Sequence, residues 1–467
     1  MKDELVQIGF EDGAGISSAA EFDELNKALE VGYTASPSSG GNALRVESLE
    51  GTLVSTTFDA KHCVLWQMIN KVPAYSTVEE YNQLTDYGAD GYGFVPAGEK
   101  PEEDDSTFAR QKDFVKYLGT TRSVQHQATL VRTVLNDAIA TENISGTMKI
   151  LRDVENSLFW GNRALKYNYP TLEGLEFNGL NQMIDSSNYL DMAGLDLSEG
   201  AFEDAAEIVA DGYGDPTHMF IGLKAAKEFS KSMLPKGRVM YPADSGGIAA
   251  GAVVKEVVTT SGTVQLAPSK FLNLGRSAKV TCPSAASSTK APTAPASITP
   301  GSMTGSTGKF HAAQQGATYF KATACNRYGE SVPTAASSLL TITSSDLAKY
   351  VPLTIANAAS VVTAPEWYNI YCTEASGTTY YLIAQVAASS QANNGTTVHN
   401  YNGLIMANTG TAFIGDMSPD ILLVKQLAPL MKMDLARTKP TFDWMILLYI
   451  VPQLKASKKW ARVLNIK

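Results

Sequence analysis

An uninterrupted run of apolar residues near the end of the chain, Trp444 to Val451, constrains the fold more than any other feature. A helix needs about 20 apolar residues to span a membrane, so this run is too short for a helical anchor. It is also too apolar for an exposed edge strand, which would pair with other chains. The run therefore predicts a buried central strand that ends at Pro452, because proline has no N–H to donate. We expect this strand to pack on a helix face formed by Met148, Leu151 and Leu158.

Basic residues, with no acidic residue among them, follow the apolar run. Unpaired charge is costly to bury, so their side chains should face water, DNA or a neighbouring subunit. A DNA contact would be independent of sequence and sensitive to salt. We favour a subunit contact, because other parts of the chain offer the complementary acids. The basic residues are Lys455, Lys458, Lys459, Arg462 and Lys467.

Composition indicates a folded protein of two or three domains. Hydrophobic residues make up 44% of the 467-residue chain and charged residues 18%. The net charge of −9 gives the surface as a whole no general attraction for nucleic acid or anionic membrane. The N-terminus shows no apolar signal segment, and "KDEL" at positions 2–5 is not C-terminal, as that retention signal must be. The widely spaced Cys63, Cys282, Cys325 and Cys372 predict buried thiols in a reducing cytoplasm, not a disulfide framework.

A Ser-, Ala-, Pro- and Thr-rich segment at 283–301 predicts a linker. Short β-rich runs follow it to about residue 408, so we expect a small β-sandwich inserted near the end of an α+β domain. "FKATACNRYGESVP" (320–333) resembles a strand and turn of fibronectin type III and related immunoglobulin-like domains. Its alternation predicts Phe320, Ala322 and Ala324 inward, with Lys321, Thr323 and Cys325 outward. Asn326 and Gly329 should form the turn, and a second hairpin should turn at Gly377.

The first part of the chain mixes helix and strand patterns. An acid-rich arm (1–60) precedes a long β-hairpin (61–122) whose tip carries Glu102, Glu103, Asp104 and Asp105. We expect this tip to contact basic side chains of an adjacent subunit, with Arg110 and Lys112 as candidates. Residues Ile144, Met148, Leu151, Val154 and Leu158 recur at helical spacing before Gly161. Further helices are predicted at about 199–211, after the N-cap candidate Ser198, and at about 223–233.

Motifs for catalysis or metal binding are weak. The five histidines have no metal-ligand spacing, and the glycine-rich "DSGGIAAG" (244–251) lacks the lysine of a phosphate-binding loop. The acids at 102–105 lack the spacing and central glycine of a calcium loop, and the chain has no GxSxG elbow. The sequence therefore predicts a protein that is not an enzyme and that needs no metal or cofactor.

Three segments carry a resemblance to a known family. "FIGDMSPDILLVKQLAPLMKMDLA" (413–436), together with the last residues from Thr441, is similar to the C-terminal region of major capsid proteins of large tailed phages, above all the Twort-like myoviruses. "VPAYSTVEEYNQL" (72–84) and "LEGLEFNGLNQMID" (172–185) resemble other parts of those proteins, although Asn178 stands where an aspartate is expected.

The resemblance implies a Hong Kong 97-type capsid fold, which is α+β. Its parts would be an N-terminal arm (1–60), an extended loop (61–122), a peripheral domain with a spine helix (123–167), an axial domain (168–283), an immunoglobulin-like insertion (284–408) and a C-terminal return to both domains (409–467).

The resemblance also implies a function. Copies of the chain would form the hexamers and pentamers of an icosahedral head in the host cytoplasm and enclose double-stranded DNA, contacted non-specifically at the inner surface, with no membrane. Portal, scaffold, maturation protease and decoration proteins are the implied partners, and the insertion would project outward to decorate the shell, contact neighbours or bind glycans. The alternatives are an encapsulin-type compartment, disfavoured by the insertion and the phage-like C-terminus, and a surface adhesin, disfavoured because no secretion signal is visible.

Overall fold

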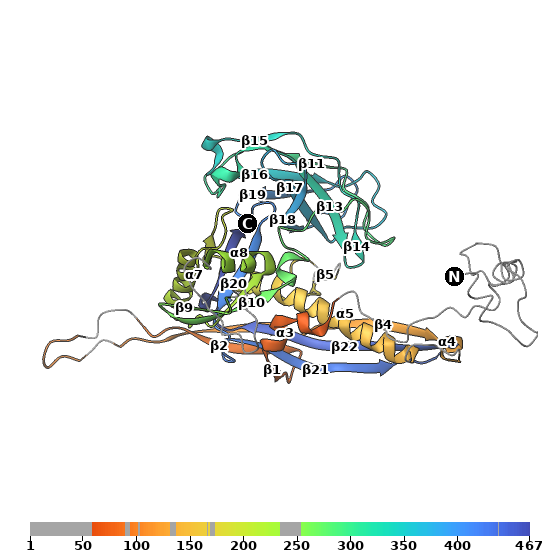
Figure 1. Cartoon of the computed structure of the whole chain (residues 1–467), viewed down its shortest axis with the longest axis horizontal. Helices are drawn as coiled ribbons and strands as arrows, with labels where there is room; N and C mark the ends of the chain where they lie inside the picture. Colours follow the sequence, from red (N-terminus) through yellow and green to blue (C-terminus); the bar gives the residue numbers. More distant parts are fainter. Residues whose placement is uncertain are drawn as a thin grey trace, which may run out of the picture.

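A computed structural model describes residues 58–88, 94–100, 103–130, 137–165, 167–168, 173–233, 254–437 and 439–467. The predicted arm therefore lies almost entirely outside the described residues. Three layers are stacked in the molecule: a long flat sheet with a helix along it, a compact α/β layer, and a β-rich unit on top (Figure 1). In the described part of the chain no helix is long and apolar enough to cross a membrane.

The apolar run lies in the second strand from one edge of the long sheet, covered on one face by the helix α5 (Ala138–Trp160). The strands, in spatial order, are β1 (Asn70–Pro73), β21 (Leu422–Asp434), β22 (Thr441–Leu454) and β4 (Lys116–Gln125). The predicted interior strand is thus confirmed, but its predicted end at Pro452 is wrong. Pairing of β22 with β4 stops at Ile450, so at Pro452 the strand has a neighbour on one side only and tolerates a missing N–H there.

The face of α5 that meets the sheet differs from the predicted one. The buried residues follow one another every four positions at Gly146, Ile150, Val154 and Leu158. By contrast, Ile144 is exposed, and Met148 and Leu151 are only half-buried. Gly146 lies on the face that meets the sheet, where a Cβ atom would lie only 2.6 Å from Ile446 Cδ1, so the absence of a side chain lets helix and strand pack closely there.

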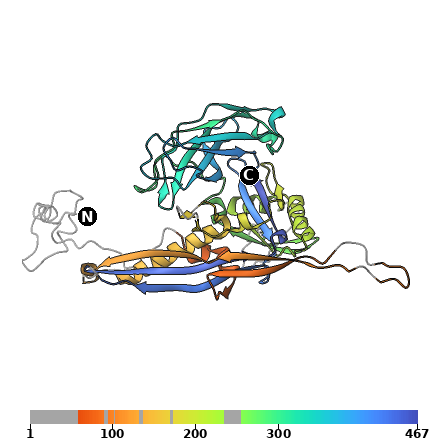
Figure 2. The same cartoon turned by 180° about the vertical axis from the view of Figure 1, so that it is seen from behind.

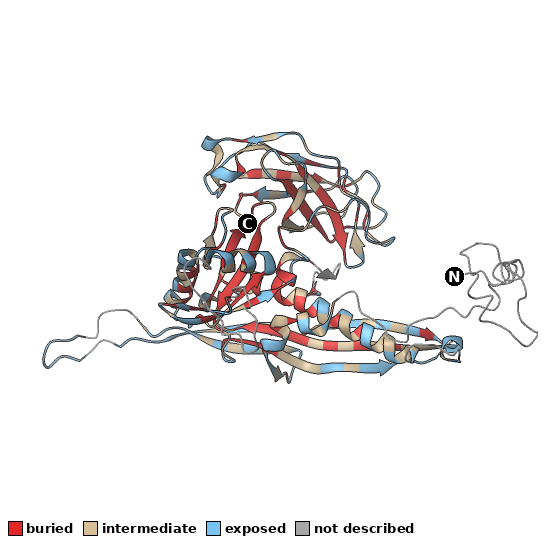
Figure 3. Cartoon of the chain, in the orientation of Figure 1, coloured by how far each residue is buried: buried red, intermediate tan, exposed pale blue. Residues whose placement is uncertain are grey.

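The α/β layer is a six-stranded sheet with helices packed on it (Figure 3). Its strands, in spatial order, are β7 (Tyr189–Asp191), β23 (Trp460–Ile466), β20 (Gly410–Gly415), β8 (His218–Gly222), β10 (Gly262–Ser269) and β9 (Glu256–Thr259). The helices predicted at 199–211 and 223–233 are confirmed as α7 (Glu199–Asp211) and α8 (Leu223–Met233). Ser198 caps α7, since its Oγ accepts a hydrogen bond from Ala201 N at 3.2 Å.

The β-rich unit has its own hydrophobic core, formed by sheets that face each other. One sheet contains β11 (Ser297–Pro300), β16 (Val351–Ala356) and β19 (Thr396–Tyr401); another contains β14 (Gly329–Glu330), β13 (Phe320–Asn326), β17 (Trp367–Thr373) and β18 (Tyr380–Ala387); the short pair is β12 (Gly316–Thr318) and β15 (Leu340–Ile342). The turn at Asn326 is confirmed, because its Oδ1 accepts hydrogen bonds from Gly329 N and Tyr328 N.

Two predictions for this unit are wrong. Thr323 and Cys325, predicted outward, are buried, and Cys325 packs with Leu165 of the body and Trp367, because the body covers this face. The segment at 283–301 is not a free linker either. Thr293 N and Ala296 N donate hydrogen bonds to backbone oxygens of the unit, so the proline-rich chain runs along the unit as part of it.

The predicted long hairpin is present as β2 (Val78–Asp86) paired with β3 (Thr107–Phe114), and it extends away from the body (Figure 2). The paired strands are shorter than the predicted 61–122, because β1 and β4 join the long sheet instead. The four cysteines are free thiols, three of them buried. The remaining short elements are α3 (Val64–Met68), α4 (His126–Leu130), α6 (Leu180–Met183), β5 (Tyr167–Asn168), β6 (Glu173–Gly174), η1 (Ala60–His62), η2 (Phe271–Asn273), η3 (Ala312–Gln314), η4 (Ser344–Asp346) and η5 (Ser457–Lys459).

Candidate assembly surfaces

The projecting hairpin presents aromatic side chains to solvent. Phe94 is 99% exposed and Tyr87 86% exposed, and Phe108 of β3 is also exposed. Phe108 is the register partner of Leu84 across the hairpin, and Leu84 is exposed too, so the two form an apolar patch of the kind that contacts other molecules. The hairpin is therefore the first candidate assembly surface.

The base of the hairpin is attached to its own body. Glu79 Oε2 lies 3.6 Å from Lys425 Nζ of β21, and both side chains are mostly buried. Next along β2, Tyr81 Oη donates a hydrogen bond to Leu454 O at 3.5 Å. These contacts set the direction in which the hairpin leaves the body.

The acidic residues predicted at the hairpin tip are only partly visible. Glu103, Asp104 and Asp105 are exposed in the segment before β3, whereas Glu102 lies outside the described residues.

The two basic candidates of the hairpin lie within β3, away from these acids. Arg110 pairs with Glu80 of its own hairpin at 3.5 Å and donates to Asn82 Oδ1 at 3.3 Å. Lys112 is exposed, opposite Glu80 in the register. The structure thus gives Arg110 a partner inside its own subunit and leaves Lys112 accessible.

The C-terminal basic residues do not form a tail. Lys458 and Lys459 lie on η5, and Arg462 lies on β23, a buried interior strand of the six-stranded sheet; Lys455 precedes η5 and Lys467 follows β23. Lys458 and Lys467 are exposed, while Lys455 and Lys459 are half-buried. The Lys455 backbone oxygen accepts a hydrogen bond from Gln83 of the hairpin.

Arg462 contradicts the prediction that all five basic side chains face outward. Its guanidinium donates to the backbone oxygens of Asn181, Asp185 and Ser186 at 3.2–3.4 Å. Burial lowers the pKa of Arg462, and the nearby Asp185 carboxylate opposes that shift. Arg462 therefore fixes a loop of its own subunit.

The face of the long sheet that points away from α5 is a second candidate surface, which the sequence analysis missed. Along β22 the even-numbered residues from Trp444 to Ile450 are buried against the helix, and the odd-numbered ones remain half-exposed. The odd side includes Leu447 and Tyr449, and Tyr117 of β4 stacks edge-on against Tyr449 at 4.8 Å. Three methionines extend this apolar face. Across β21 and β22, Met431 is the register partner of Leu447, and Met433 is the register partner of Met445.

The alternation within the apolar run could not be read from its residue types, because both faces of β22 are apolar. Methionine-rich surfaces adapt to a partner's shape. Together the hairpin and this sheet face present apolar area that the described residues do not cover. They define a structural subunit that associates with other protein chains.

Comparison with known proteins specifies that class. The family described as SU10 major capsid protein matches residues 47–318, more than half of the chain. The major capsid proteins of Staphylococcus phages S25-3 and K are each 27% identical over 456 residues, which cover 96% of both chains. A solved chain of Microbacterium phage Oxtober96 is 8% identical with a TM-score of 0.47, covering 91% of this chain and 97% of that one.

The chain belongs to the SU10 major capsid protein family. It is a structural component of a bacteriophage head that associates into a multimeric shell, and it is not an enzyme.

Proposed function

We propose that this chain forms the hexamers and pentamers of an icosahedral head with a Hong Kong 97-type fold and encloses double-stranded DNA. The supporting observation is the uncovered apolar area on an elongated subunit. The exposed aromatic residues of the hairpin and the open face of β22 require a protein partner. Copies of the same chain supply that partner in a shell.

The proposed division of the chain follows the family. Residues 1–60 form the arm, 61–122 the extended loop, 123–167 the peripheral domain and 168–283 the axial domain, to which 409–467 return. Residues 284–408 form an immunoglobulin-like insertion, a proposal supported by their separate core of facing sheets.

Further partners follow from the resemblance alone. They are the portal, the scaffold and the maturation protease during assembly in the host cytoplasm, decoration proteins outside, and DNA at the inner surface. The exposed Lys458 is assigned to a contact with acidic side chains of a neighbouring subunit, not to DNA.

The tip acids of the hairpin are proposed to contact basic side chains of a neighbour. Exposed ion pairs contribute only about 0–1 kcal/mol each, but a shell repeats every such contact many times. Reversing Glu103 and Asp105 to lysine should reduce shell yield in low salt and have less effect in high salt, where screening removes the interaction. Yield measured by sedimentation tests this, and equal yields in low salt would contradict the contact.

Electron cryomicroscopy of particles assembled from the purified chain tests the proposal as a whole. A large icosahedral shell with hexamers and pentamers is expected. A small closed cage would point to an encapsulin-type compartment, and a chain that never assembles would overturn the proposal.

A further inference from the structure

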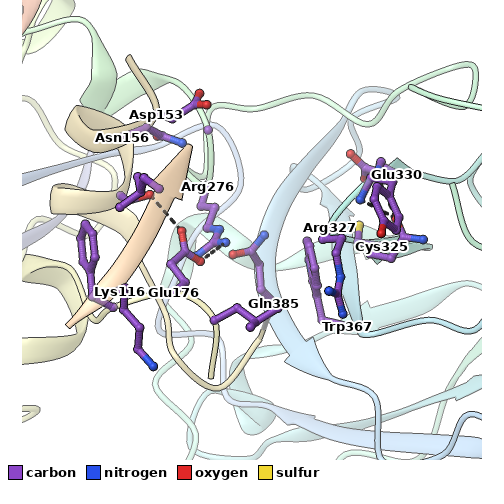
Figure 4. A pocket seen from close by; sticks show the side chains of 18 of the residues that line it. Lys116, Asp153, Asn156, Glu176, Arg276, Cys325, Arg327, Glu330, Trp367 and Gln385 are labelled. Carbon is purple, nitrogen blue, oxygen red and sulfur yellow. Dashed lines mark hydrogen bonds and ion pairs between the residues drawn. The ribbon is translucent and has the colours of Figure 1, made fainter. Parts of the chain in front are cut away.

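A cleft of about 800 Å³ separates the β-rich unit from the body (Figure 4). Its body wall is formed by the start of β4 and by α5, and its other wall by β13, β14 and β17. The unit therefore does not rest on the body as one continuous packed layer. Its position depends on the chain connections and on separate side-chain contacts.

Two of these contacts differ in chemistry. In the first, Cys325 and Trp367 of the unit pack on Leu165 of the body. Burial raises the pKa of the Cys325 thiol well above its ordinary 9.0, so this contact stays uncharged at neutral pH. In the second, His311 Nε2 of the unit lies 2.6 Å from Asp191 Oδ2 of β7. This second contact joins an imidazole to a carboxylate, so its strength depends on a proton.

The carboxylate of Asp191 is fixed within the body. Its Oδ1 accepts hydrogen bonds from Ala193 N at 2.9 Å and from Asn465 Nδ2 at 2.8 Å. Asn465 lies on the interior strand β23, and its Nδ2 also donates to Leu404 O at 2.8 Å. The side chains of Asp191 and His311 are only 15% and 27% exposed, so water and salt screen this pair less than an open surface pair.

The imidazole of His311 is anchored equally well within the unit. Its backbone N–H donates to Gln314 Oε1 at 2.8 Å. The preceding Phe310 is buried in the core of the unit, edge-on against Tyr401 with the ring centres 5.4 Å apart. Gln314 Nε2 in turn donates to Gly403 O at 3.2 Å. A change in the His311–Asp191 interaction therefore acts between two fixed parts and is not absorbed by a loose loop.

The other charged and titratable groups beside this contact are Lys309 and Tyr189. Lys309 Nζ lies 4.6 Å from the centre of the Tyr189 ring and donates a hydrogen bond to its hydroxyl. Tyr189 also interacts electrostatically with Arg462 of β23. Among these groups histidine is the residue type whose charge ordinarily changes between pH 5 and pH 8. The protonated imidazole forms an ion pair with Asp191, and the neutral imidazole retains at most a hydrogen bond.

We propose that the His311–Asp191 contact is a pH-sensitive latch, which holds the β-rich unit on the body in mildly acidic solution and releases it in mildly alkaline solution. The apolar contact at Leu165 and the chain connections remain in place, so the unit tilts without detaching and the cleft changes its width. The proposal goes beyond self-assembly, because it concerns the orientation of one unit within a single subunit.

Pulsed electron paramagnetic resonance on unassembled subunits measures this tilt. Unnatural amino acids carry the spin labels at Ser345 of the unit and Tyr213 of the body, both exposed and outside the latch. Raising the pH from 5 to 8 should increase the population with the longer distance between labels about threefold, as expected for the loss of a partly exposed ion pair. Distance distributions that are equal at the two pH values would overturn the proposal.

Two variants and a matched control assign the response to the latch. His311→Gln keeps a hydrogen-bond donor but cannot gain a charge, and Asp191→Asn removes the carboxylate, so each should make the distribution independent of pH. His399→Gln removes another half-buried histidine of the same unit and should respond as the unchanged protein does. Circular dichroism checks that each variant is folded, and if His311→Gln is unfolded, Asp191→Asn decides alone. A pH response that persists in the folded latch variants, or that disappears in His399→Gln, would overturn the proposal.

Discussion

Glu155 belongs to α5, and its fully buried side chain contacts the first turn of α3. Its two oxygens accept hydrogen bonds from the backbone N–H groups of Leu65 and Trp66, each at 2.8 Å. Burial raises the pKa of Glu155 from its ordinary 4.5 to about 7, while the backbone donors oppose the rise. Because the folded state holds the proton more tightly, this group stabilises the fold most below pH 4.5, and its contribution is lost as the pH rises through 7.

The variant Glu155→Gln keeps the size of the side chain but cannot ionise. Between pH 5 and pH 8 we expect the natural chain to lose about 2–3 kcal/mol more stability than the variant does. Urea unfolding of unassembled subunits at both pH values measures this difference. Parallel losses in the two proteins would show that Glu155 does not titrate on unfolding.

Arg462 and Lys458 allow a second comparison at the residue scale. Arg462→Ala leaves three backbone oxygens without their donor, so we expect a loss of about 1.5–3 kcal/mol in the free energy of unfolding. Lys458→Ala removes only an exposed side chain and should change stability by less than about 0.5 kcal/mol. Thermal unfolding of both variants tests this ranking, and equal losses would mean that the loop does not depend on the guanidinium.

At the scale of elements, the two faces of β22 should respond differently to the same change. Leu448 is 1% exposed against α5, whereas Leu447 lies on the open face. Leu448→Asp buries a charge in the core and should prevent folding, since an unpaired buried charge costs far more than the roughly 1.5–3 kcal/mol of a lost apolar side chain. Leu447→Asp should give a folded subunit that does not form shells.

Circular dichroism for folding and sedimentation for assembly separate these outcomes. The result that contradicts this assignment of the two faces is a Leu447→Asp chain that is as unfolded as Leu448→Asp.

The same strand shows what the sequence can predict. The interior position of the strand at 444–451, the cap of α7 at Ser198 and the turn at Asn326 depend on neighbouring residues, and these predictions are confirmed. The choice between Leu447 and Leu448, by contrast, depends on which face α5 covers. Gly146 sets that contact through its closeness to Ile446, a partner about 300 positions along the chain.

The candidate surfaces were predicted less completely for the same reason. Charge at the hairpin tip is visible in the sequence, but the partner of Arg110 depends on the register between β2 and β3. Likewise, the sequence after Val451 predicts exposed basic residues, because it does not show that β23 lies inside a sheet.

For the whole molecule, three separate cores predict that the β-rich unit can be removed without unfolding the body. No residue from 284–408 belongs to either core of the body. Ala278 and Asn408 lie at the two connections, and Asn408 N donates to Ala278 O at 3.0 Å, so a short chain can join them.

Replacing 281–403 with a Gly/Ser linker of about ten residues should therefore give a folded body. Exposure of Leu165, which packs on the removed unit, should cost no more than about 3 kcal/mol. Because the unit has a core of its own, we expect the truncated subunits still to form shells. Circular dichroism and sedimentation on the same sample distinguish the cases: an unfolded chain would make the unit an integral part of the body, and a folded chain that forms no shells would show that assembly depends on the unit.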